Sequence, residues 1–188
     1  SLGYTSMDEN IGALKNTGFE IDLKGTLIHT RDFMWRMGVN LTHYKNVVTD
    51  LPLKDMPVTG VTRLKEGRSV YDFYLREWAG VDPDNGDPLW YRNVKDAQGN
   101  VTGRTTTNDY AQADYYYVDK SSLPKVYGGF NTAFSYKGFE LSAIFAYSIG
   151  GYIVDRDVTM LWSNGSNPGR AWSTEILKRW TPENRDTD

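Results

Sequence analysis

The chain has 188 residues, a formal net charge of −3 and no cysteine, which excludes disulfides, thiolate metal sites and cysteine nucleophiles. Its sequence pI near 5.4 argues against nucleic-acid binding, because neutralising phosphates requires clustered Lys and Arg. The mean hydropathy of −0.56, and the lack of any run of about 18 apolar residues, exclude transmembrane helices. The 13 Tyr and 6 Trp favour positions with one apolar end and one wet end.

The first predicted elements are two strands near 17–28 and 33–46, joined by a short turn at 29–32. Apolar and polar residues alternate with period 2 along both, which is a strong strand signal. The apolar positions are Phe19, Ile21, Leu23, Leu27, Phe33, Trp35, Met37, Val39 and Leu41. The Pro-punctuated stretch 51–67 that follows is predicted to be a loop.

The middle of the chain is less regular. A strand is expected near 68–80, a turn at 82–88 (DPDNGDP), and a short strand at 89–93. The stretch 94–124 is polar and rich in Gly, Thr, Asn and Asp, so it is predicted to be a long loop. A short helix is predicted at 171–180, where Pro and Gly precede AWSTEILKRW.

The clearest hairpin lies at 125–137 and 139–150, joined by Lys137 and Gly138. Its apolar face contains Phe130, Phe134, Phe139, Leu141 and Phe145, and only Ile144 interrupts the polar or small opposite face. Each strand has the roughly 9–11 residues that a tilted strand needs to cross a bilayer. A hairpin of a soluble β-sandwich with one buried face is the alternative.

Loop lengths favour the membrane interpretation. Two tight turns alternate with long polar connections at 46–67, 94–124 and 151–180. Bacterial outer-membrane barrels combine short periplasmic turns with long extracellular loops, whereas a sandwich has no reason to do so. The predicted fold class is therefore all-β, with antiparallel strands and hairpins from part of a large transmembrane β-barrel.

Candidate catalytic and metal-binding residues are few. Asp82, Asp84 and Asp87 suggest a calcium loop, but the spacing departs from the EF-hand pattern, and a turn of this composition needs no metal. His29 and His43 lie at strand ends, without a G-x-S-x-G nucleophile motif. We therefore predict no catalytic residue, no cofactor and no metal site.

Four aromatic residues in the long connections are candidates for contact with a substrate or partner: Tyr115, Tyr116, Tyr117 and Trp162. Aromatic rings stack on sugar faces, and tyrosines make adaptable contacts in recognition loops. The alternative is packing within the loops, or an aromatic girdle at the membrane interface.

Five short motifs follow one another along the chain: 16–20 (NTGFE), 79–88 (AGVDPDNGDP), 123–130 (LPKVYGGF), 136–139 (YKGF) and 179–184 (RWTPEN). In this order they resemble the C-terminal third of the SusC/RagA family of TonB-dependent outer-membrane transporters. Family members import glycans or peptides with TonB energy, together with a SusD-like surface lipoprotein. The resemblance implies an outer-membrane location in a Gram-negative, Bacteroidetes-like cell, contact with membrane lipid, and no enzyme activity.

On this resemblance, residues 1–188 are expected to be a partial receptor barrel, without the plug domain, the TonB-binding segment and the closing strands. The predicted function is that of a segment of a nutrient importer. A soluble all-β module that binds or hydrolyses carbohydrate is the alternative. A sandwich would bury the phenylalanine face against a second sheet, whereas a barrel would expose it to lipid.

Overall fold

The computed structural model describes residues 12–54, 56–162 and 168–187, which form mainly antiparallel strands. The chain divides into two compact units. The first contains the described residues up to Phe73 together with Asp119–Tyr152, and the second contains Tyr74–Val118 and the described part of 153–188. None of the helices in these ranges is long and apolar enough to cross a membrane.

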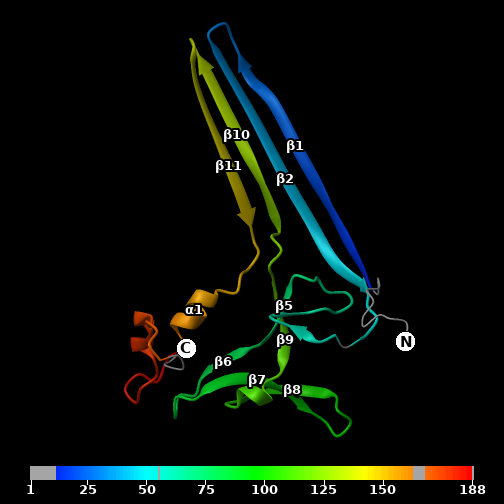
Figure 1. Ribbon diagram of the computed structural model, residues 1–188, viewed down its shortest axis with the longest axis vertical. Coiled ribbons are helices and arrows are strands. Elements are labelled where there is room, and N and C mark those ends of the chain that lie inside the picture. Colours follow the sequence, from blue (N-terminus) through cyan, green and yellow to red (C-terminus); the bar gives the residue numbers. More distant parts are fainter. Residues whose placement is uncertain (1–11, 55, 163–167, 188) are drawn as a thin grey trace, which may run out of the picture. The chain divides into compact units, whose positions relative to one another are not determined.

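A four-stranded sheet dominates the first unit (Figure 1). Its strands lie in the order β1-β2-β10-β11, and every neighbouring pair is antiparallel. The bounds are Ala13–His29 for β1, Phe33–Asp50 for β2, Val126–Tyr136 for β10 and Phe139–Ile149 for β11. Both predicted hairpins are confirmed, and β1 and β2 are longer than the alternation alone predicted.

The two tight turns lie at the same end of this sheet. The backbone N–H of Lys137 donates to the carbonyl of Asp32 over 3.0 Å, which joins the second turn to the first. Lys137 and Gly138 both have positive φ, 46° and 89°, as a two-residue hairpin turn requires. The connection from β2 to β10 and the segment after β11 therefore both leave from the opposite end.

A close approach at Gly128 fixes the pairing of β2 with β10. The Tyr147 hydroxyl reaches across Gly128 and donates to the carbonyl of Asn40 over 2.9 Å. The Asn40 side-chain oxygen accepts from the Gly129 N–H, also at 2.9 Å. A Cβ at Gly128 would collide with the Asn40 carbonyl, so only glycine fits at this position.

The register separates the sheet into an apolar and a polar face. Phe130 lies between Val39 and Phe145, and its ring stacks on Phe145 with centroids 4.4 Å apart. On the polar face, the Arg36 guanidinium pairs with Glu140 at 3.1 Å. The predicted facing of Phe130, Phe134, Phe139, Leu141 and Phe145 on one side is thus confirmed.

In the part of the chain that the structure describes, much of the apolar face of this sheet stays exposed. The apolar residues buried in the described part of the chain are only Val48, Phe73 and Ala113. By contrast, Phe139 is 81% exposed and Leu141 is 69% exposed. An apolar face of this extent in contact with water is unusual for a soluble protein.

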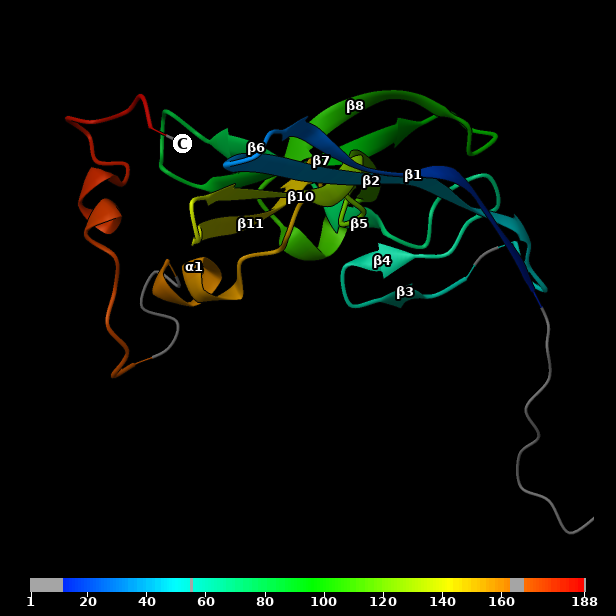
Figure 2. The same ribbon diagram turned by 90° about the horizontal axis from the view of Figure 1, so that it is seen from above.

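The first unit also contains a small hairpin within the predicted loop 51–67, which is part of a sheet in the order β3-β4-β5-β9. It consists of β3 (Val58–Thr59) and β4 (Thr62–Arg63), and β4 also pairs with Phe73 through Thr62 (Figure 2). The prediction of a single strand at 68–80 is wrong, because β5 (Asp72–Arg76) and β6 (Trp78–Val81) are separate strands that break at Glu77.

The second unit contains a three-stranded antiparallel sheet in the order β6-β7-β8, where β7 spans Pro88–Lys95 and β8 spans Val101–Thr107. The predicted turn at 82–88 and the strand at 89–93 are confirmed. The prediction of a loop throughout 94–124 is wrong. Besides β8, this stretch contains the 3-10 turn η1 (Tyr110–Gln112) and β9 (Tyr115–Ser121). The polar sequence of β8, VTGRTTT, carries no apolar alternation that could reveal it as a strand.

The expected helix at 171–180 is instead a five-residue 3-10 segment, η2 (Thr174–Lys178). A short α-helix that the sequence did not reveal, α1 (Arg156–Leu161), begins after Asp155, whose side chain accepts from the Val158 N–H. Of the predicted loop 151–180, residues 163–167 lie outside the described residues.

A buried asparagine holds the far end of β2. Asn46 is only 4% exposed, and its amide nitrogen donates to Asn16 over 2.8 Å. Its oxygen accepts from the Ser69 hydroxyl and from the Val70 N–H. One side chain therefore joins β1, β2 and the segment that leads to β5.

We expect Asn46→Ala to lower the free energy of unfolding by about 1–3 kcal/mol, because buried donors and acceptors lose their partner. Chemical denaturation in detergent micelles would measure this loss. Asn131→Ala is the matched control, since Asn131 is exposed and makes no side-chain hydrogen bond in the described structure. Equal losses for both variants would contradict the assigned role of Asn46.

Candidate functional site

The three predicted tyrosines lie together at the start of β9, and alternation along the strand sends them to two sides. Tyr115 and Tyr117 both contact the ring of Tyr74, with centroids 5.5 Å and 4.7 Å away. The Arg76 guanidinium lies 4.8 Å from the Tyr115 ring centre. Two of the three rings are therefore engaged in contacts inside the second unit.

Tyr116 belongs to a second cluster, around Arg104. The Arg104 guanidinium lies 4.1 Å from the ring centres of both Tyr91 and Tyr116, and its Nη2 pairs with Glu77 at 2.6 Å. This hydrogen bond to Glu77 raises the pKa of Arg104 above its ordinary value. The Tyr116 hydroxyl donates to the Asn93 side chain over 3.0 Å. A permanent cation between two aromatic faces ties β7, β8 and β9 together.

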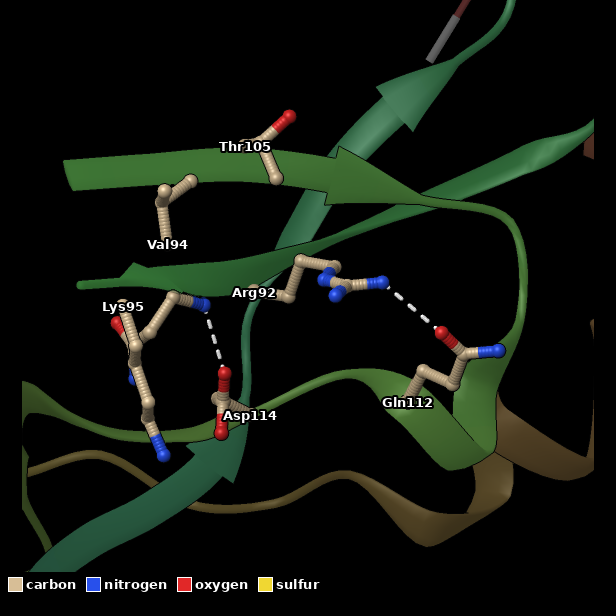
Figure 3. Close-up of a pocket in the computed structure, with 7 residues that line it drawn as sticks. Arg92, Val94, Lys95, Thr105, Gln112 and Asp114 are labelled. Atoms are coloured by element: carbon tan, nitrogen blue, oxygen red, sulfur yellow. Dashed lines mark hydrogen bonds between the residues drawn. The ribbon is translucent and has the colours of Figure 1, made fainter. Parts of the chain in front are cut away.

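A polar hollow of about 420 Å³ lies beside these strands (Figure 3). On one side, the Arg92 side chain donates to Gln112 over 2.9 Å; on another, Asp114 accepts from the Asn93 N–H at 2.6 Å. The dashed lines in Figure 3 mark both contacts, which join β7 to η1 and to the residue before β9. Four of the residues that line the hollow are thus already paired with one another.

Trp162, the fourth predicted residue, lies apart from the tyrosines. It is the C-terminal capping residue of α1, and its side chain is 56% exposed. It lines a larger hollow of about 910 Å³ together with Trp78 and Trp180. Sequence reasoning did not single out these two tryptophans, although Trp180 belongs to the 179–184 motif.

Trp180 packs on the Asp-rich turn and brings two of the sequence motifs into contact. Its indole N–H donates to the Pro83 carbonyl over 3.1 Å, and its ring lies directly against Gly86. Gly86 has φ of +81°, so glycine is favoured there by both backbone conformation and space.

The aspartates of this turn act as internal hydrogen-bond acceptors. Asp82 accepts from the Asp84 N–H at 2.9 Å, and Asp87 accepts from the Asn108 amide at 2.8 Å. Across residues 12–54, 56–162 and 168–187, no group of three or more His, Asp or Glu side chains could hold a metal ion. His43 lies on the first-unit sheet, where its Nδ1 contacts the Lys125 carbonyl and its ring packs on Phe19.

Gly86→Ala should destabilise the second unit more than Gly99→Ala does. Both glycines have similar positive φ, +81° and +85°, so both variants carry the same backbone strain of about 1–3 kcal/mol. Only at Gly86 would the new Cβ meet an indole ring, 2.6 Å from Trp180, while nothing lies within 4 Å at Gly99. Thermal unfolding followed by tryptophan fluorescence measures the difference, and identical melting temperatures would refute the docking of Trp180.

Comparison with known proteins identifies the class. No protein-family model matches the chain. It is 28% identical to TonB-dependent receptor P3 of Formosa agariphila over 211 residues, which covers 99% of this chain and 20% of that receptor. It is also 28% identical to TonB-dependent receptor SusC of Bacteroides thetaiotaomicron, over 78% of this chain and 15% of SusC.

The fold agrees. The solved structure of the RagAB peptide transporter matches 99% of this chain with a TM-score of 0.80 and 32% sequence identity. A second structure, of the RagAB peptide importer in its closed-closed state, gives a TM-score of 0.78. The chain is thus homologous, over nearly its whole length, to a segment of the TonB-dependent receptors, a class of transporters and not of enzymes. Within that class, the resemblance to the SusC/RagA receptors is confirmed. The chain spans about a fifth of the length of the relatives it matches.

Proposed function

We propose that this chain is part of an outer-membrane TonB-dependent importer of SusC type, with the sheet β1-β2-β10-β11 as a piece of its transmembrane wall. The observation that carries the proposal is the uncovered apolar face of that sheet. Its aromatic rings stack on one another, as Phe130 does on Phe145, yet no element among the described residues buries them. Lipid chains are the environment in which such a face is stable.

The parent protein would import an oligosaccharide or peptide together with a SusD-like lipoprotein, and would draw energy from TonB. Residues 1–188 would then supply part of the barrel and its extracellular connections, while the plug domain and closing strands belong to the rest of the parent. RagAB is a peptide transporter, and SusC is a TonB-dependent receptor. The proposal therefore includes both substrate classes, oligosaccharides and peptides.

The second unit would lie outside the cell. Its residues belong to the connection from β2 to β10 and to the segment after β11, and both begin at the end of the sheet opposite the two tight turns. Substrate or partner contact by Tyr115, Tyr116, Tyr117 and Trp162 remains part of the proposal. Trp162 is the best supported of the four, since more than half of its side chain is free to contact a ligand. The tyrosines would contribute chiefly by holding the second unit rigid.

The lipid-facing assignment is tested by two neighbouring positions on β11. Phe145→Arg should cost about 2–4 kcal/mol near the bilayer midplane, because it places a charge in lipid. Ile144→Arg points to the opposite, polar face, where Ile144 is already 86% exposed, and should be tolerated. Denaturation of the parent transporter in lipid vesicles measures both. Equal destabilisation would disprove the assignment.

The orientation is tested by labelling single-cysteine variants of the parent in intact cells. A membrane-impermeant thiol reagent should modify Gln98→Cys, at the β7–β8 turn, and spare Lys137→Cys, at the β10–β11 turn. This region has no cysteine of its own to give background. The reverse labelling pattern would place the second unit in the periplasm and remove its proposed contact with substrate.

A further inference from the structure

The hollow of about 910 Å³ in the second unit is built mainly from apolar side chains of three separate segments. The first segment, from β6 to the start of β7, contributes Trp78, Val81 and Pro88. The end of α1 contributes Trp162, and the segment from η2 onward contributes Ile176 and Trp180. Its volume is in the range of sites that bind small organic ligands.

Several hydrogen bonds hold the wall around Trp180 in place before any ligand binds. Trp180 is fixed by its bond to Pro83 and by its contact with Gly86. The segment beyond it is folded back by Asn184, whose amide donates to the carbonyls of Lys178 and Arg179. The Thr187 hydroxyl donates to the same Lys178 carbonyl over 2.8 Å. A preformed site avoids much of the entropic cost of ordering loops on binding.

Two indole rings remain available beside this fixed wall. Trp78 is 45% exposed and Trp162 is 56% exposed, although both line a concave surface. Polar groups lie beside them, namely the Glu175–Lys178 ion pair at 2.6 Å and the Arg179 guanidinium. The ion pair largely neutralises itself, so the hollow does not demand a strongly charged ligand.

From this arrangement we infer that the hollow is an oligosaccharide-binding subsite, in which Trp78 and Trp162 stack on sugar rings. The faces of an indole are electron-rich, and the C–H groups on the flat side of a pyranose carry partial positive charge. Hydroxyls around the edge of the sugar would meet the side chains of Glu175, Lys178 and Arg179. An apolar peptide side chain prefers a fully enclosed apolar slot, whereas these rings are open to water and bordered by polar groups.

This inference rests on the proposed function and narrows it, because it names the substrate class and the residues that would bind it. It is nevertheless testable by binding alone, without TonB, a lipoprotein or transport. The probes are maltohexaose and cellohexaose, which differ in their linkage, and an uncharged hexapeptide of alanine and leucine. The parent receptor is kept in lauryldimethylamine oxide micelles, a detergent without a sugar headgroup, and titrated by calorimetry and tryptophan fluorescence.

We expect at least one hexasaccharide to bind saturably, and Trp162→Ala to weaken it by tenfold or more. Trp162→Tyr, which keeps an aromatic ring, should retain most of the affinity. Trp172→Ala is the matched control, since Trp172 is 50% exposed and does not line the hollow. Circular dichroism verifies that each variant is folded, and Trp162→Tyr provides the comparison if Trp162→Ala is not.

Three results would overturn the inference: no saturable binding of either saccharide at millimolar concentration, binding of the hexapeptide alone, or equal weakening by Trp172→Ala. None of these would affect the lipid-facing test at Phe145, so the proposed function would still stand or fall on its own evidence. Suppose instead that Phe145→Arg and Ile144→Arg destabilised the protein equally while saccharide bound at the hollow. The membrane proposal would then fall, and a carbohydrate-binding module would be favoured.

Discussion

The pairing of β2 with β10 is the constraint on which the first unit depends. It joins two local hairpins into one sheet across a connection that runs from 51 to 125. Closing this long loop costs conformational entropy, which the contacts between β2 and β10 must offset. The Gly128 crossing sets the register: Tyr147 donates to Asn40 over a position that has no side chain. A shift of one residue would put Phe130, Phe134 and Tyr136 on the polar face.

The same register determines which face of the sheet carries the apolar side chains. Because Phe130, Val39 and Phe145 are neighbours on one side, the four strands together present one mainly apolar face. The opposite side carries Arg36 paired with Glu140, which requires an aqueous surrounding. A sheet with these two faces is stable only between two different environments. Lipid and a wet lumen meet that requirement without a second sheet, whereas a soluble sandwich would need a covering layer.

Sequence patterning predicted the first unit far better than the second. The hairpins of β1 with β2 and of β10 with β11 follow from strict alternation, which a half-apolar sheet imposes on its sequence. The polar strand β8 and the short helix α1 were missed because neither buries an apolar face that would leave such a pattern. The β2–β10 pairing was also beyond prediction, since it depends on residues 88 positions apart, Asn40 and Gly128, and on the side chain of Tyr147.

The candidate site also could not be predicted fully from the sequence. Sequence reasoning selected tyrosines by their density at 115–117, but density does not distinguish rings that pack on each other from rings that face solvent. In the structure Tyr74 and Arg104 engage the tyrosines, while Trp162 keeps most of its surface. Trp78 and Trp180 join it only because the 82–88 turn and the 179–184 segment fold against one another through Pro83 and Gly86. A turn made by aspartate acceptors thus holds one wall of an aromatic hollow, so these aspartates contribute to the hollow through the shape they give that wall.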